Sequence, residues 1–228
     1  MAPRIGINEI VLNDRPSGTR QREINLLPAL LRELRSVGWQ SLVYLASDLG
    51  DMTASRLLDG ETPVVVRSPI PSSPTYARIA RGIAYWRKRC RQDRLDLFHM
   101  AYYPVPNIDV PLVLTVNDLR FVHMPDTYSP ARLWFLRATV GSSIKRANRI
   151  IAISGDTRND LVRHFNVAPE LIDVVHIPAD PAFCRVTDPH RLESVRRRHR
   201  LPDKYVLYVG HLEPRKNLVR LVQAFAAL

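Results

Sequence analysis

The sequence predicts an α/β protein: a doubly wound parallel sheet, followed by the first β–α unit of a second domain of the same kind. Three observations predict this. Short apolar segments of strand length recur along the chain, segments of helix length separate them, and turns rich in proline, glycine and serine mark the boundaries. Strands that alternate with helices in this way form parallel sheets with helices on both faces.

The first strand–helix–strand unit sets the pattern. Residues 4–12 are expected to form a strand that ends before the turn around Ser17 and Gly18. Apolar residues then recur at helical spacing from Ile24 to Leu34, and Gly38 ends this helix. Residues 41–46 form the next expected strand. The unit is therefore the start of a sheet whose first two strands are joined by a crossover helix.

The later segments continue the alternation. Further strands are expected at residues 64–66, 95–99, 112–116, 149–153 and 173–177. Helices are expected at residues 130–146 and 156–165, between the last of these strands. The first domain therefore extends to residue 180.

A long basic helix is expected between the third and fourth strands. One line of apolar side chains has helical spacing, and we expect it to be buried against the sheet: Tyr76, Ile79, Ile83, Trp86 and Cys90. Basic residues crowd the rest of the helix: Arg78, Arg81, Arg87, Lys88, Arg89, Arg91 and Arg94. This charge favours peripheral contact with an anionic membrane. A solvated helix face is the alternative.

Composition narrows the classes of partner and compartment. The 228 residues carry a formal charge of +11, which suits an anionic partner such as a phosphorylated substrate, an anionic lipid surface or nucleic acid. Nucleic acid is not expected, because the basic helix lacks interleaved exposed aromatics and no nucleic-acid motif is present. The low cysteine content favours a reducing compartment, and both cysteines are expected to be packing residues. With no signal peptide or membrane span in the sequence, we expect a cytoplasmic protein.

The C-terminal fifth of the chain differs from the rest. Residues 181–203 are predicted to be an interdomain linker that contains a polar, arginine-rich helix. Residues 204–228 then read as a strand at 205–209, a turn at 210–217 and an amphipathic helix at 218–228. One strand and one helix cannot close a core of their own, so this segment is expected to be the truncated start of a second domain.

Five stretches, taken in order, carry a resemblance to a known family. They are Ser17-Gly18, Asp96-Leu-Phe-His99, Val116-Asn-Asp-Leu119, Ala147-Asn-Arg-Ile-Ile-Ala-Ile-Ser154 with Asp160-Leu161, and Tyr208-Val-Gly-His-Leu-Glu-Pro-Arg-Lys-Asn217. In this order and spacing the chain resembles the group 1 family of retaining GT-B glycosyltransferases. The last stretch resembles the branch of that family rich in mannosyltransferases of surface polysaccharide assembly.

The resemblance implies both a domain plan and a reaction. Residues 1–180 would be the Rossmann-like, acceptor-side N-terminal domain, and residues 204–228 would begin the donor-binding C-terminal domain. The reaction implied is retaining transfer of a hexose, with mannose the sugar the branch suggests, from a nucleotide diphosphate sugar to a glycan or lipid-linked acceptor. The nucleotide sugar is the donor substrate; no cofactor and no metal are implied.

The resemblance assigns the donor diphosphate to Arg215 and Lys216. A nucleoside diphosphate gains negative charge as the glycosidic bond breaks, and fixed cations stabilise that charge. A solvated turn before a helix is the alternative for these two residues. In the first domain, Ser17 and Gly18 precede a helix whose free N–H groups can receive a phosphate or an acceptor hydroxyl, although a capped helix start explains them equally. Arg20 and Arg22 could add charge there or be solvated surface residues.

Three strand-end residues complete the predicted site. Asn117 stands where many members of the family have a histidine beside the transferred sugar. An asparagine side chain cannot exchange a proton near neutral pH, so a catalytic role for Asn117 is limited to positioning. His99 and Tyr102 are predicted acceptor contacts, with a structural role as the alternative for His99. Asp118 is expected to brace the adjacent loop.

Two further function classes remain open from the residues alone. The chain could be a non-catalytic acceptor-binding module, or one subunit of a split glycosyltransferase that pairs with a separate C-terminal domain. If the predicted second domain is truncated, the chain by itself is expected to be inactive. No P-loop, zinc-protease, hydrolase or EF-hand pattern occurs in the sequence, and no cluster of metal ligands is expected.

Overall fold

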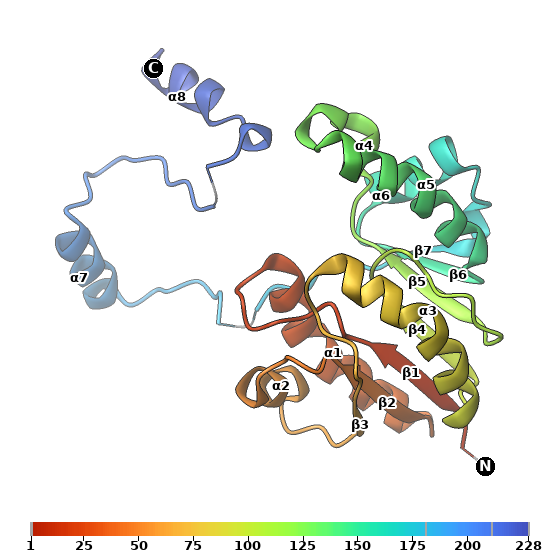
Figure 1. Ribbon diagram of the computed structural model, residues 1–228. Helices are drawn as coiled ribbons and strands as arrows, with labels where there is room; N and C mark the ends of the chain where they lie inside the picture. Colours follow the sequence, from red (N-terminus) through yellow and green to blue (C-terminus); the bar gives the residue numbers. More distant parts are fainter. Residues whose placement is uncertain (1, 181, 211, 228) are drawn as a thin grey trace. The chain divides into compact units, whose positions relative to one another are not determined.

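The protein is represented by a computed structural model that describes residues 2–180, 182–210 and 212–227, apart from the side chain of Arg215. The chain divides into two compact units, Met1–Asp180 and Pro181–Leu228 (Figure 1). The boundary falls where the sequence predicts the linker to begin. The roles assigned to residues 181–203 and 204–228 stay predictions.

The first unit is built on one seven-stranded parallel sheet. Its order is β3-β2-β1-β4-β5-β6-β7, and every neighbouring pair is parallel. The strands are β1 (Arg4–Asn8), β2 (Gln40–Leu45), β3 (Val64–Arg67), β4 (Leu97–Met100), β5 (Leu112–Val116), β6 (Arg149–Ala152) and β7 (Ile172–Val174). The predicted doubly wound α/β fold is confirmed.

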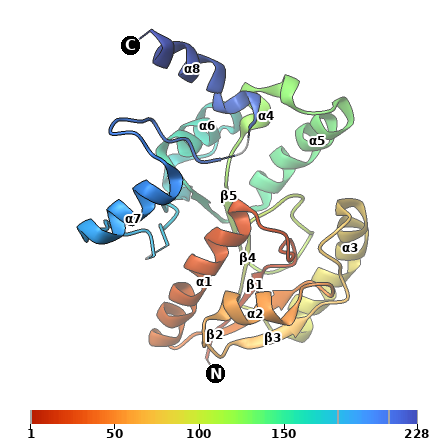
Figure 2. The same ribbon diagram turned by 90° about the vertical axis from the view of Figure 1, so that its left-hand side faces the viewer.

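Helices cover the sheet on both faces. In Figure 2, α1 lies on one side of the strands, and α3 and α5 lie on the other. The helices of this unit are α1 (Gly18–Ser36), α2 (Asp51–Leu58), α3 (Thr75–Gln92), α4 (Arg120–His123), α5 (Pro130–Arg146) and α6 (Gly155–Phe165), with short 3₁₀ turns η1 (Pro125–Thr127) and η2 (Pro169–Leu171). The sequence reasoning did not anticipate α2 or α4.

Side-chain caps fix where two of these helices begin. Ser17 accepts a hydrogen bond from the N–H of Arg20 at the start of α1, and Ser154 accepts one from Thr157 at the start of α6. Each serine satisfies a backbone donor that the first helical turn leaves free. At the other end of α6, Asn166 adopts a left-handed conformation that ends the helix.

The core lies between the sheet and its helices. Central strand residues such as Ile7, Phe98 and Leu114 are fully buried. The indole of Trp86 on α3 packs against the rings of Tyr44 and Phe98, each with ring centroids 5.3 Å away. These contacts fix α3 to the middle of the sheet, because packed aromatic rings bury large apolar areas.

The buried face of α3 differs from the predicted one. Trp86 and Cys90 are buried as expected, but Tyr76 and Ile83 are 77% and 68% exposed. The buried side of the helix instead follows residues four apart, which are Arg78, Gly82, Trp86 and Cys90. A Cβ at Gly82 would lie 3.3 Å from the Trp86 ring, so the glycine leaves room for the indole. The inward stripe therefore includes a charged residue and a glycine, which hydropathy alone does not reveal.

The strand order places a crevice between β1 and β4. From β1 the strands β2 and β3 extend the sheet toward one edge, and β4 to β7 extend it toward the other. At such a switch point, the loops that leave the carboxyl ends of the two strands diverge, and open α/β sheets bind ligands there. The residues that follow β1, β4 and β5 are therefore the natural candidates for a site.

The second unit contains α7 (Pro189–His199), η3 (Pro214–Lys216) and α8 (Leu218–Ala226). The polar helix and the terminal helix occur as predicted, but the strand predicted at 205–209 is not formed. A strand needs a hydrogen-bonded neighbour, and the described residues of this unit include no other extended segment that pairs with it. The packing role expected for Cys184 is also wrong, because its side chain is exposed.

Candidate binding site at the carboxyl edge of the sheet

A pocket of about 400 Å³ lies beside the carboxyl ends of β4 and β5. Tyr102 follows β4, and Asn117 follows β5, so parallel strands bring two residues fifteen positions apart to one wall. The remaining lining comes from the segment after β1, the first turn of α1, and α3 and α5. The pocket is lined by Val11, Thr19, Thr75, Arg78, Ala101, Tyr102, Tyr103, Asn117, Asp118, Arg132, Phe135 and Leu136.

Asn117 is held in a fixed orientation. Its side-chain oxygen accepts a hydrogen bond of 3.1 Å from Arg22, and its amide nitrogen donates to the carbonyl of Ala101 at 3.5 Å. The neighbouring Asp118 accepts from the N–H of Arg120, as its predicted bracing role requires. Asn117 thus presents a positioned amide at the pocket, which can bind a hydroxyl but cannot transfer a proton.

Arg22 lies at the centre of a buried polar cluster that consists of Glu9, Arg22, Glu23 and Asn117. Its guanidinium Nη1 lies 2.8 Å from Glu23 Oε1 and 3.1 Å from Asn117 Oδ1. Arg22 and both glutamates are buried. Of the two sequence readings for Arg22, the solvated surface arginine is wrong. A buried carboxylate is unfavourable unless an opposite charge lies near it. Arg22 supplies that positive charge for Glu9 and Glu23.

Glu9 is the least satisfied member of the buried polar cluster. Neither carboxyl oxygen finds a hydrogen-bond partner among the described residues. Burial, with a smaller contribution from nearby Glu23, raises the pKa of Glu9 well above its ordinary value, and Arg22 opposes the rise. Burial also raises the pKa of Glu23. A protonated Glu9 leaves one carboxylate against one guanidinium, which balances the charge of the cluster.

The raised pKa of Glu9 gives a prediction about pH. The folded state keeps a proton that the unfolded chain loses near pH 4.3, so stability is highest below that pH and falls as pH rises toward the folded-state pKa. Glu9→Gln should flatten this fall, because glutamine does not titrate. Urea midpoints measured from pH 4 to pH 8 test this, with Glu33→Gln at an exposed position of α1 as the control. Equal pH curves for the Glu9 variant and the wild type would contradict a buried, proton-binding Glu9.

Tyr102 and Tyr103, which follow β4, line the pocket together with Arg78 of α3. Arg78 is buried, donates to the carbonyl of Ser72, and lies over the Tyr102 ring with its guanidinium carbon 5.4 Å from the centroid. The hydroxyl of Tyr103 finds no partner among the described residues. Burial raises the pKa of both tyrosines, so their hydroxyls keep their protons. They remain available to donate to a bound ligand.

His99 does not reach the pocket wall. Its Nε2 lies 2.8 Å from the Thr115 hydroxyl between β4 and β5, and the side chain is buried. Burial, and to a lesser degree the charge of Arg22, lowers the pKa of His99 to about 4. The imidazole is therefore neutral near pH 7, which agrees with the structural role that is the alternative for His99. The prediction that His99 contacts an acceptor has no support from this placement, whereas Tyr102 lines the pocket.

The loop at the start of α1, Ser17-Gly18-Thr19, contacts the pocket only through Thr19 among the residues that the structure describes. Thr19 lines the pocket, while Ser17 caps the helix and Gly18 has open space beside its Cα. The first helical turn can still offer backbone N–H groups to an anion or a hydroxyl. Arg20 donates to the carbonyl of Asp14. Ser17 therefore has a structural role as a helix cap, and the proposed ligand role of Ser17 and Gly18 stays a prediction.

The predicted diphosphate residues lie in the second unit. Lys216 is exposed and ends the 3₁₀ turn η3, and its N–H donates to the carbonyl of Glu213. Asn217 then takes a left-handed conformation before α8 begins. The side chain of Arg215 lies outside the described residues. The diphosphate role of Arg215 and Lys216 stays a prediction.

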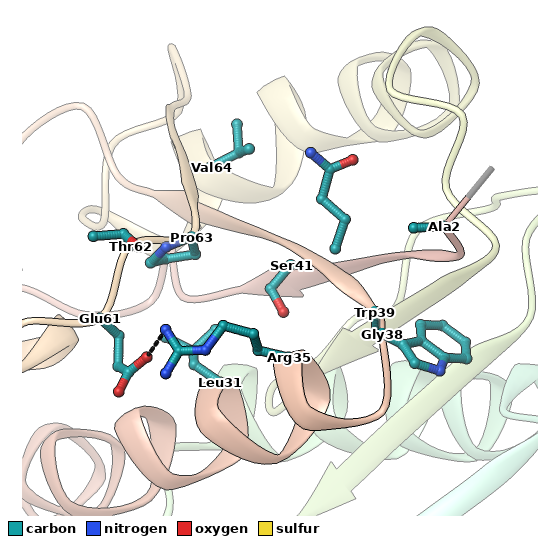
Figure 3. Close-up of a pocket in the computed structure, with 11 residues that line it drawn as sticks. Ala2, Leu31, Arg35, Gly38, Trp39, Ser41, Glu61, Thr62, Pro63 and Val64 are labelled. Carbon is teal, nitrogen blue, oxygen red and sulfur yellow. Dashed lines mark ion pairs between the residues drawn. The ribbon is translucent and has the colours of Figure 1, made fainter.

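Other pockets lie elsewhere on the first unit. A pocket of about 500 Å³ lies at the amino ends of β2 and β3, on the edge away from the polar cluster (Figure 3). Its charged groups are already paired, since Arg35 lies 3.0 Å from Glu61. A smaller apolar pocket of about 300 Å³ shares Arg78 and Tyr102 with the candidate site and continues along α3 past Trp86. The charged groups of the amino-edge pocket are therefore paired with each other, whereas the apolar pocket extends the candidate site.

The fold also assembles three possible metal ligands, contrary to the sequence-based expectation. His123, Asp160 and His164 lie together, with one ligand atom from each within 4.8 Å of the others. The spacing of Asp160 and His164 places both on one side of α6. That spacing was the available signal, and His123 is brought in only by tertiary packing.

Sequence reasoning also missed Glu9, Glu23 and Arg78. Each is a charged residue in a segment otherwise read as amphipathic or apolar, and each is buried beside the switch point. For Glu9, the available signal in the sequence was its place directly after the apolar strand β1. Charged residues are rarely buried unless they have a partner or a function.

The fold and the site together define a class of protein: a doubly wound α/β domain with a pocket that carries polar side chains at the carboxyl edge of its sheet. Residues 27–183 match the family model described as Glycosyltransferase Family 4, and the chain belongs to this family.

Two mannosyltransferase relatives agree with this assignment, and a solved structure shares the fold. The chain is 25% identical over 150 residues to the O-antigen chain mannosyltransferase B of Escherichia coli, covering 63% of this chain and 37% of that protein. It is 25% identical over 88 residues to the serotype-specific mannosyltransferase WbdA of Escherichia coli, covering 38% of this chain and 11% of that protein. A crystal structure of UDP-N-acetylglucosamine 2-epimerase aligns with a TM-score of 0.52 at 16% identity, over 76% of this chain and 48% of that one, and shows the shared fold.

Two facts bound these similarities. The chain matches well under two thirds of the length of either mannosyltransferase. Among the described helices, none combines the length and apolar character needed to cross a bilayer.

Proposed function

We propose that this chain is the acceptor-side part of a glycosyltransferase that transfers a hexose, specifically mannose, from a nucleotide diphosphate sugar to a glycan or lipid-linked acceptor. Membership of the glycosyltransferase family and the two mannosyltransferase relatives support the reaction and the sugar. Retention of anomeric configuration and independence from metal ions and cofactors follow from the resemblance and are part of the proposal.

One observation carries the proposal. Asn117 and Tyr102 line a single pocket at the carboxyl edge of the sheet, beside a hydroxyl of Tyr103 that has no partner in the part of the chain that the structure describes. Amide and phenol groups donate and accept hydrogen bonds, and a sugar offers several hydroxyls in the same role. Buried groups left unpaired favour a ligand that pairs with them, because an unsatisfied buried group costs about 1–3 kcal/mol.

The apolar pocket beside this site supports a lipid-linked acceptor. It shares Arg78 and Tyr102 with the sugar-binding pocket and is otherwise lined mainly by apolar side chains. A pyrophosphate-linked lipid would present an anion to the Arg78 guanidinium and a hydrocarbon chain to the apolar wall. The donor diphosphate would meet Arg215 and Lys216 of the second unit.

Transfer assays test the function. Nucleoside diphosphate hexoses are incubated with a mannoside acceptor, products are detected by mass spectrometry, and the anomeric configuration is assigned by NMR. We expect retained mannose transfer by the longest polypeptide that contains this chain. Residues 1–228 alone should give none, since the second unit has no strand among its described residues and so offers no sheet to build a donor pocket. Acceptor binding without transfer by the longer polypeptide would favour the non-catalytic module instead.

Asn117→Ala should lower turnover about tenfold in that longer polypeptide. The variant loses one positioned hydrogen bond, and about 1.4 kcal/mol corresponds to one factor of ten. No new pH dependence should arise, because neither side chain titrates. Steady-state kinetics from pH 6 to pH 9 measure both effects, with a thermal midpoint to show that the variant is folded. Unchanged turnover would remove Asn117 from the site.

We also propose that α3 brings the domain to anionic membranes. The structure changes the basis of this idea, because Tyr76 and Ile83 are exposed and can enter the interface beside the basic residues. Part of the charge is already neutralised. Arg87 and Arg91 share Asp109, and Arg89 lies 2.6 Å from Asp93. Apolar contact and the remaining charge would therefore act together.

Vesicle co-sedimentation tests this membrane contact. Binding should require anionic lipid, weaken with salt, and fall when Arg87, Lys88, Arg89 and Arg91 are all replaced by Gln. The double change Tyr76→Ser with Ile83→Ser should also weaken it. The matched control removes the same charge from α7 and its cap, at Arg196, Arg197, Arg198 and Arg200. Equal losses in the α3 and α7 variants would mean that net charge, rather than this helix, drives binding.

A further inference from the structure

Three metal-ligating side chains meet where α4 packs on α6. His123 Nε2 lies 2.7 Å from Asp160 Oδ2, and His164 Nε2 lies 3.9 Å from Asp160 Oδ1. The two imidazole rings face each other edge to face, with centroids 5.5 Å apart. Each of the two histidines thus directs a ring nitrogen toward the same carboxylate, and the arrangement converges on one point.

The distances suit a single small cation. Zinc binds imidazole nitrogen and carboxylate oxygen at about 2.0–2.2 Å, so two ligand atoms of a tetrahedral zinc ion lie about 3.4 Å apart. The three atoms here already lie within 4.8 Å of one another. Side-chain rotations that bring these atoms closer by up to roughly 1.4 Å would place all three on one ion.

Exposure at the cluster suits an ion that enters from solvent. The side chains of His123 and His164 are 50% and 33% exposed, whereas that of Asp160 is 18% exposed. The carboxylate is therefore the sheltered base of the cluster, and the imidazoles form its open side. A fourth position toward solvent is left for water, as in zinc sites that have three protein ligands.

We propose that His123, Asp160 and His164 form a binding site for a first-row transition-metal dication, with zinc as the physiological ion. Two imidazoles and one carboxylate favour zinc, cobalt, nickel or copper over magnesium and calcium, which prefer sets of oxygen ligands. The ion is not a participant in glycosyl transfer. Its effect is mechanical: it links α4 to α6.

A metal link between α4 and α6 would also affect the loop that precedes α4. α4 begins directly after Asn117, Asp118 and Leu119, the loop that lines the candidate sugar pocket. The contact between α4 and α6 is otherwise made by apolar groups, such as the Phe121 and Phe165 rings at 6.4 Å. A metal bound by both helices would stabilise this contact and with it the loop that carries Asn117, because a ligand that binds only the folded state raises its stability.

Metal titration of the full chain tests the proposal. Zinc is titrated by calorimetry in a buffer that does not bind metals, and cobalt is followed by its visible absorption bands. We expect one site, with affinity at least about tenfold weaker in His123→Ala, His164→Ala and Asp160→Asn. His176→Ala, at an exposed histidine of the same unit outside the cluster, is the matched control and should bind as the wild type does.

A thermal readout separates metal binding from a merely structural role. Zinc should raise the unfolding midpoint of the wild type and of His176→Ala, and should leave that of His123→Ala unchanged. Zinc affinity that is equal in the wild type and in all three cluster variants would overturn the proposal. So would an absence of tetrahedral cobalt bands in the wild type, since the cluster would then be only a carboxylate that pairs with His123 at 2.7 Å and lies 3.9 Å from His164.

Discussion

Replacing Arg22 by methionine should destabilise the protein by about 3–5 kcal/mol, the cost of removing one partner from a buried ion pair. Arg22 and Glu23 are both buried, with 2.8 Å between Nη1 and Oε1. Methionine keeps an unbranched apolar chain close in length to the aliphatic part of arginine, so the loss comes mainly from the missing guanidinium charge. Urea unfolding at pH 7, followed by circular dichroism, measures the change.

Two further variants make the Arg22 experiment specific. Adding Glu23→Gln to Arg22→Met should restore much of the loss, because the uncompensated carboxylate is then removed. Arg32→Met is the matched control on the same helix, since Arg32 is half exposed and lies 3.5 Å from Glu61. An exposed pair contributes about 0–1 kcal/mol. If Arg22→Met were no more costly than Arg32→Met, Arg22 would not be the residue that balances the buried charge.

Trp86→Ala on α3 should cost about 3–5 kcal/mol, as is typical when a large aromatic side chain is removed from a core. The indole is 2% exposed and contacts the rings of Tyr44 and Phe98. Ile83→Ala, three residues earlier on the same helix, is the control. Since Ile83 is 68% exposed, its change should stay within about 0.5 kcal/mol.

The pair of α3 variants decides which face of the helix is buried. If Ile83→Ala were as damaging as Trp86→Ala, the apolar line expected from spacing would be the true inner face. The membrane proposal would then lose its exposed apolar residues. Thermal unfolding of both variants provides the comparison in one experiment.

The candidate site could be predicted in part. Asn117 and Tyr102 were found because they follow strands of a parallel sheet, and such strands end at one edge. His99 follows the same logic but points between two strands to Thr115. Strand-end position is visible in a sequence, whereas the direction of the side chain depends on which neighbours the strand acquires. Arg22 shows the converse, since a residue with no local signal of burial is placed against Asn117 by α1.

The sequence by itself determined the class of fold, the positions of the strands and most helices of the first unit, and the family. These follow from local properties: strand and helix periodicity, capping residues such as Ser17 and Ser154, and short motifs at fixed spacing. Only the tertiary structure decided that Arg78 rather than Ile83 faces inward on α3, that Glu9 and Arg22 are buried together, and that His123 joins Asp160 and His164. The reason is physical. Burial and pairing of charges depend on contacts between segments far apart in the chain, which no local pattern contains.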